Sequence, residues 1–299
     1  MSARDPGLSR TAANLLLLVC AAIWGVAFLF QKSATAHLGP WTFVALRALA
    51  ATITLAPFAL WERQRAGEGV DVRHRPLTVA TGAAFLVSAV LQQWGMESAT
   101  VTNTGLLTGL YVVATPVMAW LLIGERPTRQ LWCAVALSLT GLWLLGGGGV
   151  GGLGTGDRLV AIAAILWGLY VVLLGMASSY GAPIQRTTLQ LATVAVLGLI
   201  GAVLFETTTW AAVESAARDI VFVGVVSTAL TFTLFTIAVR WTSPVAAAVI
   251  VSSETLFAAG AGYLVLGERL SPLGLFGAAL MVLAILWVQL PKQLGCSRN

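Results

Sequence analysis

Long apolar runs, separated by short polar segments, make up most of this chain. A helix needs about 20 predominantly apolar residues to cross the hydrocarbon core of a bilayer. In lipid, backbone donors and acceptors must be paired inside each segment, which favours helices. The pattern therefore predicts an all-α membrane protein with ten transmembrane helices, at roughly residues 14–35, 41–61, 77–97, 102–123, 130–147, 159–179, 185–205, 219–239, 245–266 and 271–290.

Landmarks of the first half of the chain recur in the second half. Trp24-Gly25 returns as Trp167-Gly168, and Gly124-Glu125-Arg126 returns as Gly267-Glu268-Arg269, in both cases 143 positions later. A period of this length is typical of a duplicated half-protein, and in a membrane chain it favours a transporter. Each half holds five predicted spans, so the second half enters the membrane from the opposite side. We therefore expect two inverted five-helix repeats.

The expected organisation is a first repeat at residues 1–147, a glycine-rich linker at 148–158 and a second repeat at 159–299. The apolar run that begins at Asn14 is longer than the core of a signal peptide, about 7–15 residues, so we expect a retained first span. With the N-terminus inside, most lysines and arginines fall on the inner side of the membrane. This asymmetry predicts that both termini are cytoplasmic.

The composition agrees with a membrane protein and excludes several other classes. The chain is 58% hydrophobic and 10% charged, with a mean hydropathy of +0.88, whereas soluble domains are about a quarter charged. The net charge of +5 does not indicate nucleic-acid binding, because the basic residues lie in short loops between spans. The cysteines, Cys20, Cys133 and Cys296, have neither metal-ligand nor disulfide spacing.

Signals of an enzyme are missing from the sequence. Its two histidines, His37 and His74, lie at span ends or in loops, and no metalloprotease, serine-hydrolase or nucleotide-binding motif is present. The glycine-rich stretch at 146–156 lacks the Gly-Lys-Ser/Thr ending of a phosphate-binding loop. We expect no cofactor and no metal. A membrane-embedded enzyme and a channel-like facilitator remain the alternatives to a carrier.

Two charges fall inside predicted spans, where a charge is costly and marks a candidate functional residue. Glu254 lies deep in the ninth span and Arg47 lies nearer the interface in the second. They could pair as packing contacts, and Arg47, like Lys32 at the end of the first span, could reach the interface with its long side chain. In a polar cavity, Arg47 could instead meet a substrate carboxylate, and Glu254 an ammonium group or a proton. Gln190 occupies the place of Arg47 in the second half, which favours a shared cavity-facing position.

Aromatic and polar stripes supply the other candidates. Trp24 shares a helix face with Phe28 and Gln31, and Trp167 shares one with Tyr170. Gln92 is a polar residue in the third span, and Thr104, Thr108, Tyr111 and Thr115 form a stripe along the fourth. Such residues serve packing and interhelical hydrogen bonds as readily as a cavity. The candidate substrate-binding residues are Trp24, Phe28, Arg47, Gln92, Thr108, Tyr111, Trp167, Tyr170 and Glu254.

The paired Trp-Gly motifs and the Leu-x-x-Gly-Glu-Arg endings of spans four and nine resemble the EamA-type branch of the drug/metabolite transporter superfamily, over about residues 14–290. The resemblance implies a bacterial inner-membrane carrier that exports amino acids, including aromatic ones, or related metabolites. It implies small-molecule and lipid partners, and both halves in one chain favour a monomer. The family often has Glu-Pro where this chain has Glu254-Thr255. Glu125 and Glu268 are interpreted as structural or gating residues.

Overall fold

The computed structural model describes residues 8–66, 70–145, 154–266 and 271–289, and within these ranges the chain forms helices and no strand. The predicted all-α class is confirmed. In the first half of the chain the helices are α1 (Arg10–Ala34), α2 (Pro40–Ala66), α3 (Arg75–Met96), α4 (Val101–Thr108), α5 (Tyr111–Ile123) and α6 (Arg129–Leu145). In the second half they are α7 (Thr155–Ser178), α8 (Pro183–Phe205), α9 (Trp210–Ser215), α10 (Ala217–Val221), α11 (Thr231–Ala238), α12 (Pro244–Val251), α13 (Glu254–Ala261) and α14 (Pro272–Gln289).

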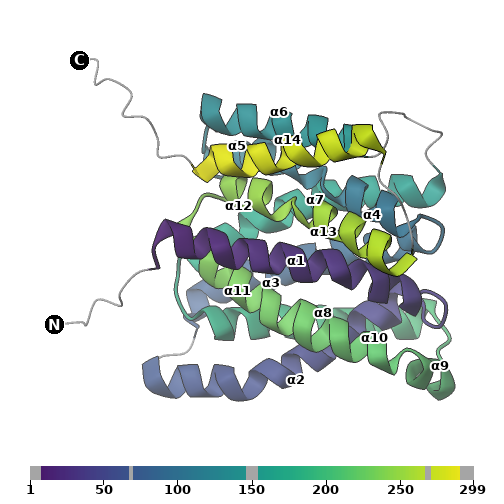
Figure 1. The fold of residues 1–299 in the computed structure, drawn as a ribbon. Coiled ribbons are helices and arrows are strands. Elements are labelled where there is room, and N and C mark those ends of the chain that lie inside the picture. Colours follow the sequence, from purple (N-terminus) through teal and green to yellow (C-terminus); the bar gives the residue numbers. More distant parts are fainter. Residues whose placement is uncertain (1–7, 67–69, 146–153, 267–270, 290–299) are drawn as a thin grey trace.

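Shorter helical turns complete these elements. They are the 3-10 turns η1 (Val72–His74) and η3 (Val239–Trp241) and the π-helical segments η2 (Phe222–Leu230) and η4 (Gly262–Leu266). In Figure 1 the helices lie roughly side by side, and the start of α1 and the end of α14 are found at the same end of the bundle.

The described helices are long and apolar enough for a multi-pass membrane protein. Eight helical segments reach the length and hydropathy of a membrane span, and two shorter apolar helices cover Arg129–Leu145 and Pro272–Val288. Large apolar side chains face outward, among them Val203 and Phe205 on α8, which are 83% and 70% exposed. An exposed apolar surface of this kind suits contact with lipid.

Two of the predicted spans are divided. The fourth breaks between α4 and α5 at Gly109-Leu110, and the ninth breaks between α12 and α13 at Ser252-Ser253, 143 positions later. At both breaks the backbone tightens into i to i+3 hydrogen bonds, from Val112 N to Gly109 O at 3.1 Å and from Thr255 N to Ser252 O at 3.2 Å. The fourth and ninth predicted spans are thus each present as two shorter helices joined by a tightened turn.

The second break forms without a proline. The hydroxyls of Ser252 and Ser253 donate to the carbonyls of Val249 and Ile250, at 2.8 and 2.7 Å. Serine hydroxyls that bond to the preceding turn compete with the regular helical ladder and bend it. Thr255 stands at the position that follows the glutamate, and the serine pair at the break precedes Glu254.

Each Trp-Gly motif packs against the divided helix of the other half. On Gly25 of α1 a Cβ atom would lie 2.5 Å from the backbone oxygen of Glu254 and 2.8 Å from the backbone nitrogen of Ala258. On Gly168 of α7 it would lie 3.0 Å from the backbone nitrogen of Thr115, 143 positions before Ala258. Only glycine permits such an approach of two helix backbones. The first helix of each half is thus held by the opposite half.

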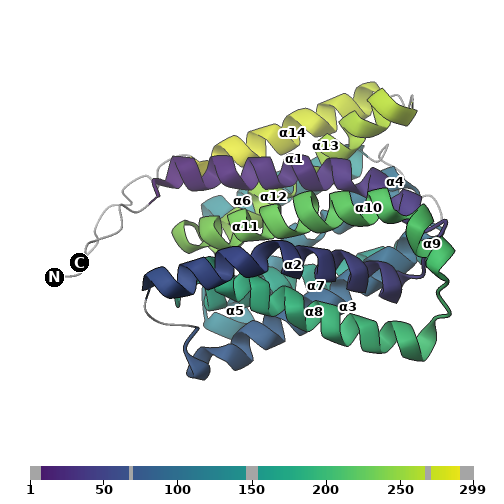
Figure 2. The same cartoon turned by 90° about the horizontal axis from the view of Figure 1, so that it is seen from below.

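Helices α2 and α8 cap each other's N-terminus. The carboxylate of Glu206, which follows α8, accepts from the backbone nitrogens of Trp41 and Thr42, both at 2.9 Å. The carboxylate of Glu62, near the end of α2, accepts from those of Ile184 and Gln185, at 3.3 and 2.8 Å. A carboxylate satisfies the free N–H groups of a helix start and complements its dipole. The two helices therefore run antiparallel and lie side by side (Figure 2).

Replacing Glu206 with glutamine should lower the free energy of unfolding by about 1–2 kcal/mol, the usual size of a lost helix cap. The reason is that glutamine brings one N–H donor group to face backbone donors and the hydroxyl of Thr42, which now donates to Glu206 at 2.6 Å. Thermal unfolding in detergent measures the change. Glu62→Gln should cost less, because its bonds are fewer, and the exposed Glu214→Gln is the matched control. Equal midpoints for the three variants would contradict the capping role.

Candidate functional site

All nine candidate residues line one cavity in the middle of the bundle. The further lining residues are Gln31, Val171, Ser227, Phe232, Phe235 and Val251. The space open to the centre of a water molecule is about 60 Å³, and about 10–15 Å³ on that measure is enough for one water. The cavity is therefore roomy enough for several waters or a compact solute, with polar groups at its walls.

The aromatic side chains form one continuous wall. The ring of Phe232 on α11 lies 4.8 Å from the ring of Trp24 and 6.3 Å from that of Trp167, between centroids. Tyr170 meets Trp167 edge-on, at 5.4 Å and 88°. Edge-to-face and offset contacts are the preferred geometries of aromatic pairs. The two tryptophans of the repeated motif are thus joined through a residue of the second half.

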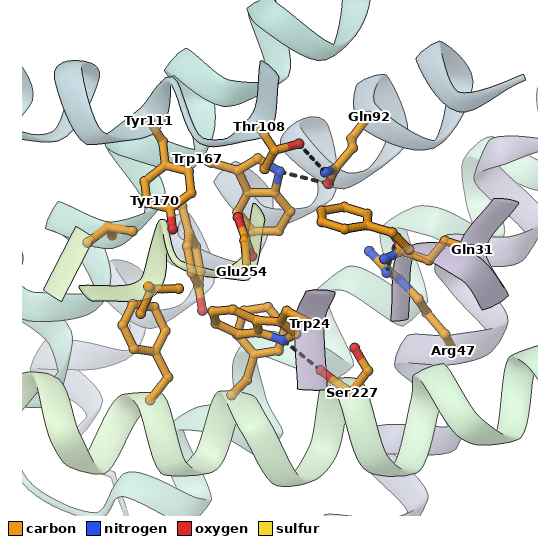
Figure 3. A pocket seen from close by; sticks show the side chains of 15 residues that line it. Trp24, Gln31, Arg47, Gln92, Thr108, Tyr111, Trp167, Tyr170, Ser227 and Glu254 are labelled. Atoms are coloured by element: carbon orange, nitrogen blue, oxygen red, sulfur yellow. Dashed lines mark hydrogen bonds between the residues drawn. The ribbon is translucent and has the colours of Figure 1, made fainter. Parts of the chain in front are cut away.

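The polar edges of both tryptophans are bonded to the protein. The indole nitrogen of Trp24 donates to the carbonyl of Ser227 at 2.9 Å, in the π-helical segment η2, a form common at functional sites. The indole nitrogen of Trp167 donates to Gln92 Oε1 at 3.0 Å, and Gln92 Nε2 donates to Thr108 Oγ1 at 2.7 Å (Figure 3). These bonds fix the rings, so the faces of the tryptophans, and not their N–H groups, are offered to a ligand.

The threonine stripe of the fourth span divides in the structure. Thr108 and Tyr111 line the cavity, but Thr104 and Thr115 do not. The hydroxyls of Thr104 and Thr115 donate to the carbonyls four residues earlier, at 2.8 Å in each case. The break at Gly109-Leu110 ends the regular helical spacing on which the stripe was based, so only its middle faces the cavity.

Arg47 points into the bundle and not toward the interface. Its side chain is 5% exposed, which contradicts the interpretation that it reaches the membrane surface. One terminal nitrogen donates to Gln31 Oε1 at 3.1 Å, and the guanidinium lies 5.7 Å from the centre of the Phe85 ring. Its Nε has no hydrogen-bond partner among the described residues. A buried guanidinium with an unused donor is suited to a carboxylate ligand.

Gln190, the counterpart of Arg47, does not line the cavity. It is 1% exposed, and its Nε2 donates to the hydroxyl of Tyr170 at 3.3 Å. It lies behind Tyr170 and orients it, so the expected shared cavity-facing position is wrong. Lys32 also serves the scaffold, because its ammonium donates to the carbonyls of Met96 and Ala99 at 2.5 and 3.0 Å and caps the end of α3.

Glu254 is the other charged group of the cavity wall. It begins α13, and Tyr111, 143 positions earlier, begins α5. Glu254 is 4% exposed and lies near the hydroxyl of Tyr111, but not in regular hydrogen-bond geometry, since this hydroxyl has no such partner in the described part of the chain. Figure 3 shows Glu254 with Tyr111 and Tyr170, apart from Arg47 and Gln31.

The two charges do not pair with each other. Within the described ranges, neither Arg47 nor Glu254 has an oppositely charged partner, so the interpretation that they neutralise each other in packing is wrong. An isolated charge in a buried site is expensive unless a ligand or a proton compensates it. The cavity therefore offers a guanidinium and a carboxyl group at separate places of a wall that also carries aromatic rings.

Comparison with known proteins agrees with this arrangement. The EamA-like transporter family matches the chain twice, over residues 11–147 and 154–290. The chain belongs to this family. It is 28% identical over 285 residues, 95% of this chain and 88% of the relative, to an uncharacterized transporter of Archaeoglobus fulgidus (strain ATCC 49558 / DSM 4304 / JCM 9628 / NBRC 100126 / VC-16). It is 24% identical over 291 residues, 91% and 92% of the two chains, to the uncharacterized transporter YwfM of Bacillus subtilis (strain 168).

A solved structure titled "Crystal structure of protein" shares the fold, with a TM-score of 0.76, 18% identity, and coverage of 94% of this chain and 97% of the other. The EamA-like protein is thus a multi-pass membrane protein whose relatives are named transporters, not enzymes. The family resemblance seen in the sequence is confirmed. Glu268, the linker at 148–153 and Cys296 lie outside the described residues.

Some lining residues were not among the nine candidates. Gln31 was recognisable, because helical spacing places it on the face of Trp24 and Phe28. Ser227, Phe232 and Phe235 lie in an apolar span without a polar stripe that would mark one face. Only the packing of η2 and α11 against α1 identifies them as part of the cavity wall.

Proposed function

We propose that this protein exports amino acids, aromatic ones in particular, or related small metabolites, by alternating access through the central cavity. The observation that carries the proposal is that Arg47 and Glu254 line one cavity without pairing with each other, together with the rings of Trp24 and Trp167. A zwitterionic amino acid presents a carboxylate and an ammonium group on one carbon, and an aromatic side chain can stack on the rings. Charge-assisted bonds give such a site its orientation, and ring contacts its affinity.

The proposed architecture is ten transmembrane helices in two inverted five-helix repeats, residues 1–147 and 159–299. The predicted linker at 148–158 ends earlier than expected, because α7 begins at Thr155. Three observations at the same interval of 143 support the two repeats: the breaks at Gly109 and Ser252, the contacts of Gly25 and Gly168, and the capped nitrogens of Trp41 and Ile184. Transporters of this kind bind substrate at the interface of the repeats, near the membrane midplane.

We place the protein in the bacterial inner membrane with both termini in the cytoplasm. At the end of the bundle where α1 begins, the described helix ends and the short connections between them carry Arg63, Arg65, Arg73, Arg75, Arg126 and Arg240. An excess of arginine on one side marks the cytoplasmic face. We expect the protein to work as a monomer, because the cavity takes residues from both halves of a single chain.

Counterflow in liposomes tests the proposed function. Vesicles that contain the purified protein and are loaded with unlabelled L-phenylalanine should take up labelled L-phenylalanine faster than unloaded vesicles, because a carrier returns more quickly with substrate bound. L-Tryptophan inside should accelerate uptake as well, and vesicles without protein are the control. Uptake without acceleration would indicate a channel-like facilitator, and no uptake of either amino acid would overturn the proposal.

A further inference from the structure

We propose that the carboxyl group of Glu254 binds a proton and the ammonium group of the substrate in turn, so that one proton is exchanged for each substrate molecule. The inference rests on the proposed function and adds its coupling ion. It starts from a carboxyl group that is 4% exposed, in a cavity wall, with no oppositely charged partner among the described residues.

The carboxyl group needs compensation in both states of the cavity. A carboxylate without a partner in a buried site is strongly disfavoured, and such a group becomes neutral by taking a proton. An ammonium group removes this penalty because it supplies the missing positive charge and hydrogen-bond donors. Proton and ammonium therefore compete for the same oxygens, and a cavity that empties on one side of the membrane must take up a proton there.

The hydroxyl of Tyr111 lies near the carboxyl group of Glu254 and can hydrogen-bond to either of its protonation states. Tyr111 comes from the opposite half of the chain, and its hydroxyl has no regular hydrogen-bond partner within the described ranges. A phenol can donate to a carboxylate and can accept from a carboxylic acid. The Tyr111 hydroxyl is therefore suited to a neighbouring carboxyl group that alternates between its protonated and its charged form.

No other lining group can take this role in the physiological range. The titratable or charged groups that face the cavity with Glu254 are Tyr111 on α5, Tyr170 on α7 and Arg47 on α2. Phenols and guanidinium groups ordinarily titrate at about 10 and above 12. The lining residues from α1, α3, α4, η2, α11 and α12 are neutral. The hydroxyl of Tyr170 also has a hydrogen-bond partner already, since Gln190 donates to it.

The exchange can be followed atom by atom. When substrate enters from the cytoplasm, the carboxylic O–H bond of Glu254 breaks, the proton leaves to water in the cavity, and the carboxylate pairs with the ammonium group. After the cavity opens to the outside, the substrate departs and water delivers a proton to the carboxylate. One positive charge then moves inward for each zwitterion exported, so the exchange should respond to the membrane potential as well as to pH.

A pH gradient across liposomes tests this coupling. With the potential clamped by potassium and valinomycin, an interior more acidic by one pH unit should drive about tenfold accumulation of labelled L-phenylalanine, since one pH unit corresponds to tenfold at one proton per substrate. Glu254→Gln should abolish accumulation, and Glu214→Gln, exposed on α9, should behave as wild type. Counterflow by the wild type without any accumulation would overturn the inference and leave the proposed function standing.

Proton release on binding tests the same site without transport. In weakly buffered detergent solution, wild-type protein should release about one proton for each molecule of 2-phenylethylamine bound, and none with 3-phenylpropionate, which lacks the amine. If Glu254→Gln does not fold, proton release by the wild-type protein still tests whether amine binding displaces a proton. Binding of the amine with no proton release would overturn the inference, whereas failure to bind either ligand or L-phenylalanine would overturn the proposed function as well.

Discussion

Replacing Gly25 with alanine should separate α1 from α13 and destabilise the protein by about 1–3 kcal/mol or more, the range for an overpacked core. The added methyl carbon would lie 2.5 Å from the backbone oxygen of Glu254 and 2.6 Å from the Cβ of Phe257. Neither atom can move without its helix, so the helices must part. Thermal unfolding in detergent measures the loss, and L-phenylalanine counterflow should fall with it, because α1 and α13 both line the cavity.

Two further alanine variants test this expectation, one as a second example and one as a control. Gly168→Ala should behave like Gly25→Ala, because its methyl carbon would meet the Cβ of Ala114 at 2.7 Å. Gly260→Ala is the matched control on α13, since no other heavy atom lies within 4 Å of the new carbon. In a helix, alanine is favoured over glycine by about 0.5–1 kcal/mol, so the control should be neutral or stabilising. A control as unstable as Gly25→Ala would contradict the packing argument.

The glycines of the Trp-Gly motifs show which part of the fold can be predicted from the sequence and which part cannot. Their interval of 143 indicates a duplication from the sequence alone. It does not indicate that each glycine meets the opposite half, because a repeat in sequence carries no information about which surfaces pack together. The partners of Gly25 and Gly168 depend on close approach of helices that are far apart in the chain.

The breaks in the fourth and ninth spans could not be predicted from the sequence, for a related reason. Hydropathy records the length of an apolar segment, and a segment that tightens for one turn at Gly109 or Ser252 keeps its length and its apolar character. Pro116, the helix-breaking residue of the fourth span, lies inside α5 and not at the break. The break of the ninth span comes from two serine hydroxyls that bond to the preceding turn.

The cavity itself was largely predictable because buried charge and polar faces are unusual in lipid. Helical spacing related Trp24 to Phe28, and burial in lipid singled out Glu254. The direction of a long side chain was not predictable: Arg47 is near enough to the interface to reach it, and only the position of Gln31 and Phe85 explains why it turns inward.

Replacing Arg47 with glutamine should weaken binding of carboxylate-bearing ligands selectively. Hydrogen bonds to a charged group contribute about 1.5–3 kcal/mol, which corresponds to about 10–150-fold in the dissociation constants of L-phenylalanine and 3-phenylpropionate. Binding of 2-phenylethylamine, which has no carboxylate, should change little or become tighter, because one positive charge is removed from the wall. Isothermal titration of the three ligands against wild type and variant measures the difference directly.

The difference between the three ligands shows whether Arg47 binds the ligand carboxylate or only packs α2 against α1. If Arg47 only holds α2 against Gln31 on α1, its loss should distort the cavity and weaken the three ligands alike, with a lower unfolding temperature. Arg126→Gln, on the exposed turn after α5, is the control for charge alone and should leave all three affinities unchanged. Equal losses for acid, amine and zwitterion would reject the guanidinium as the carboxylate site and would leave Arg47 as a packing residue, because only a group that meets the carboxylate can distinguish ligands that differ in it.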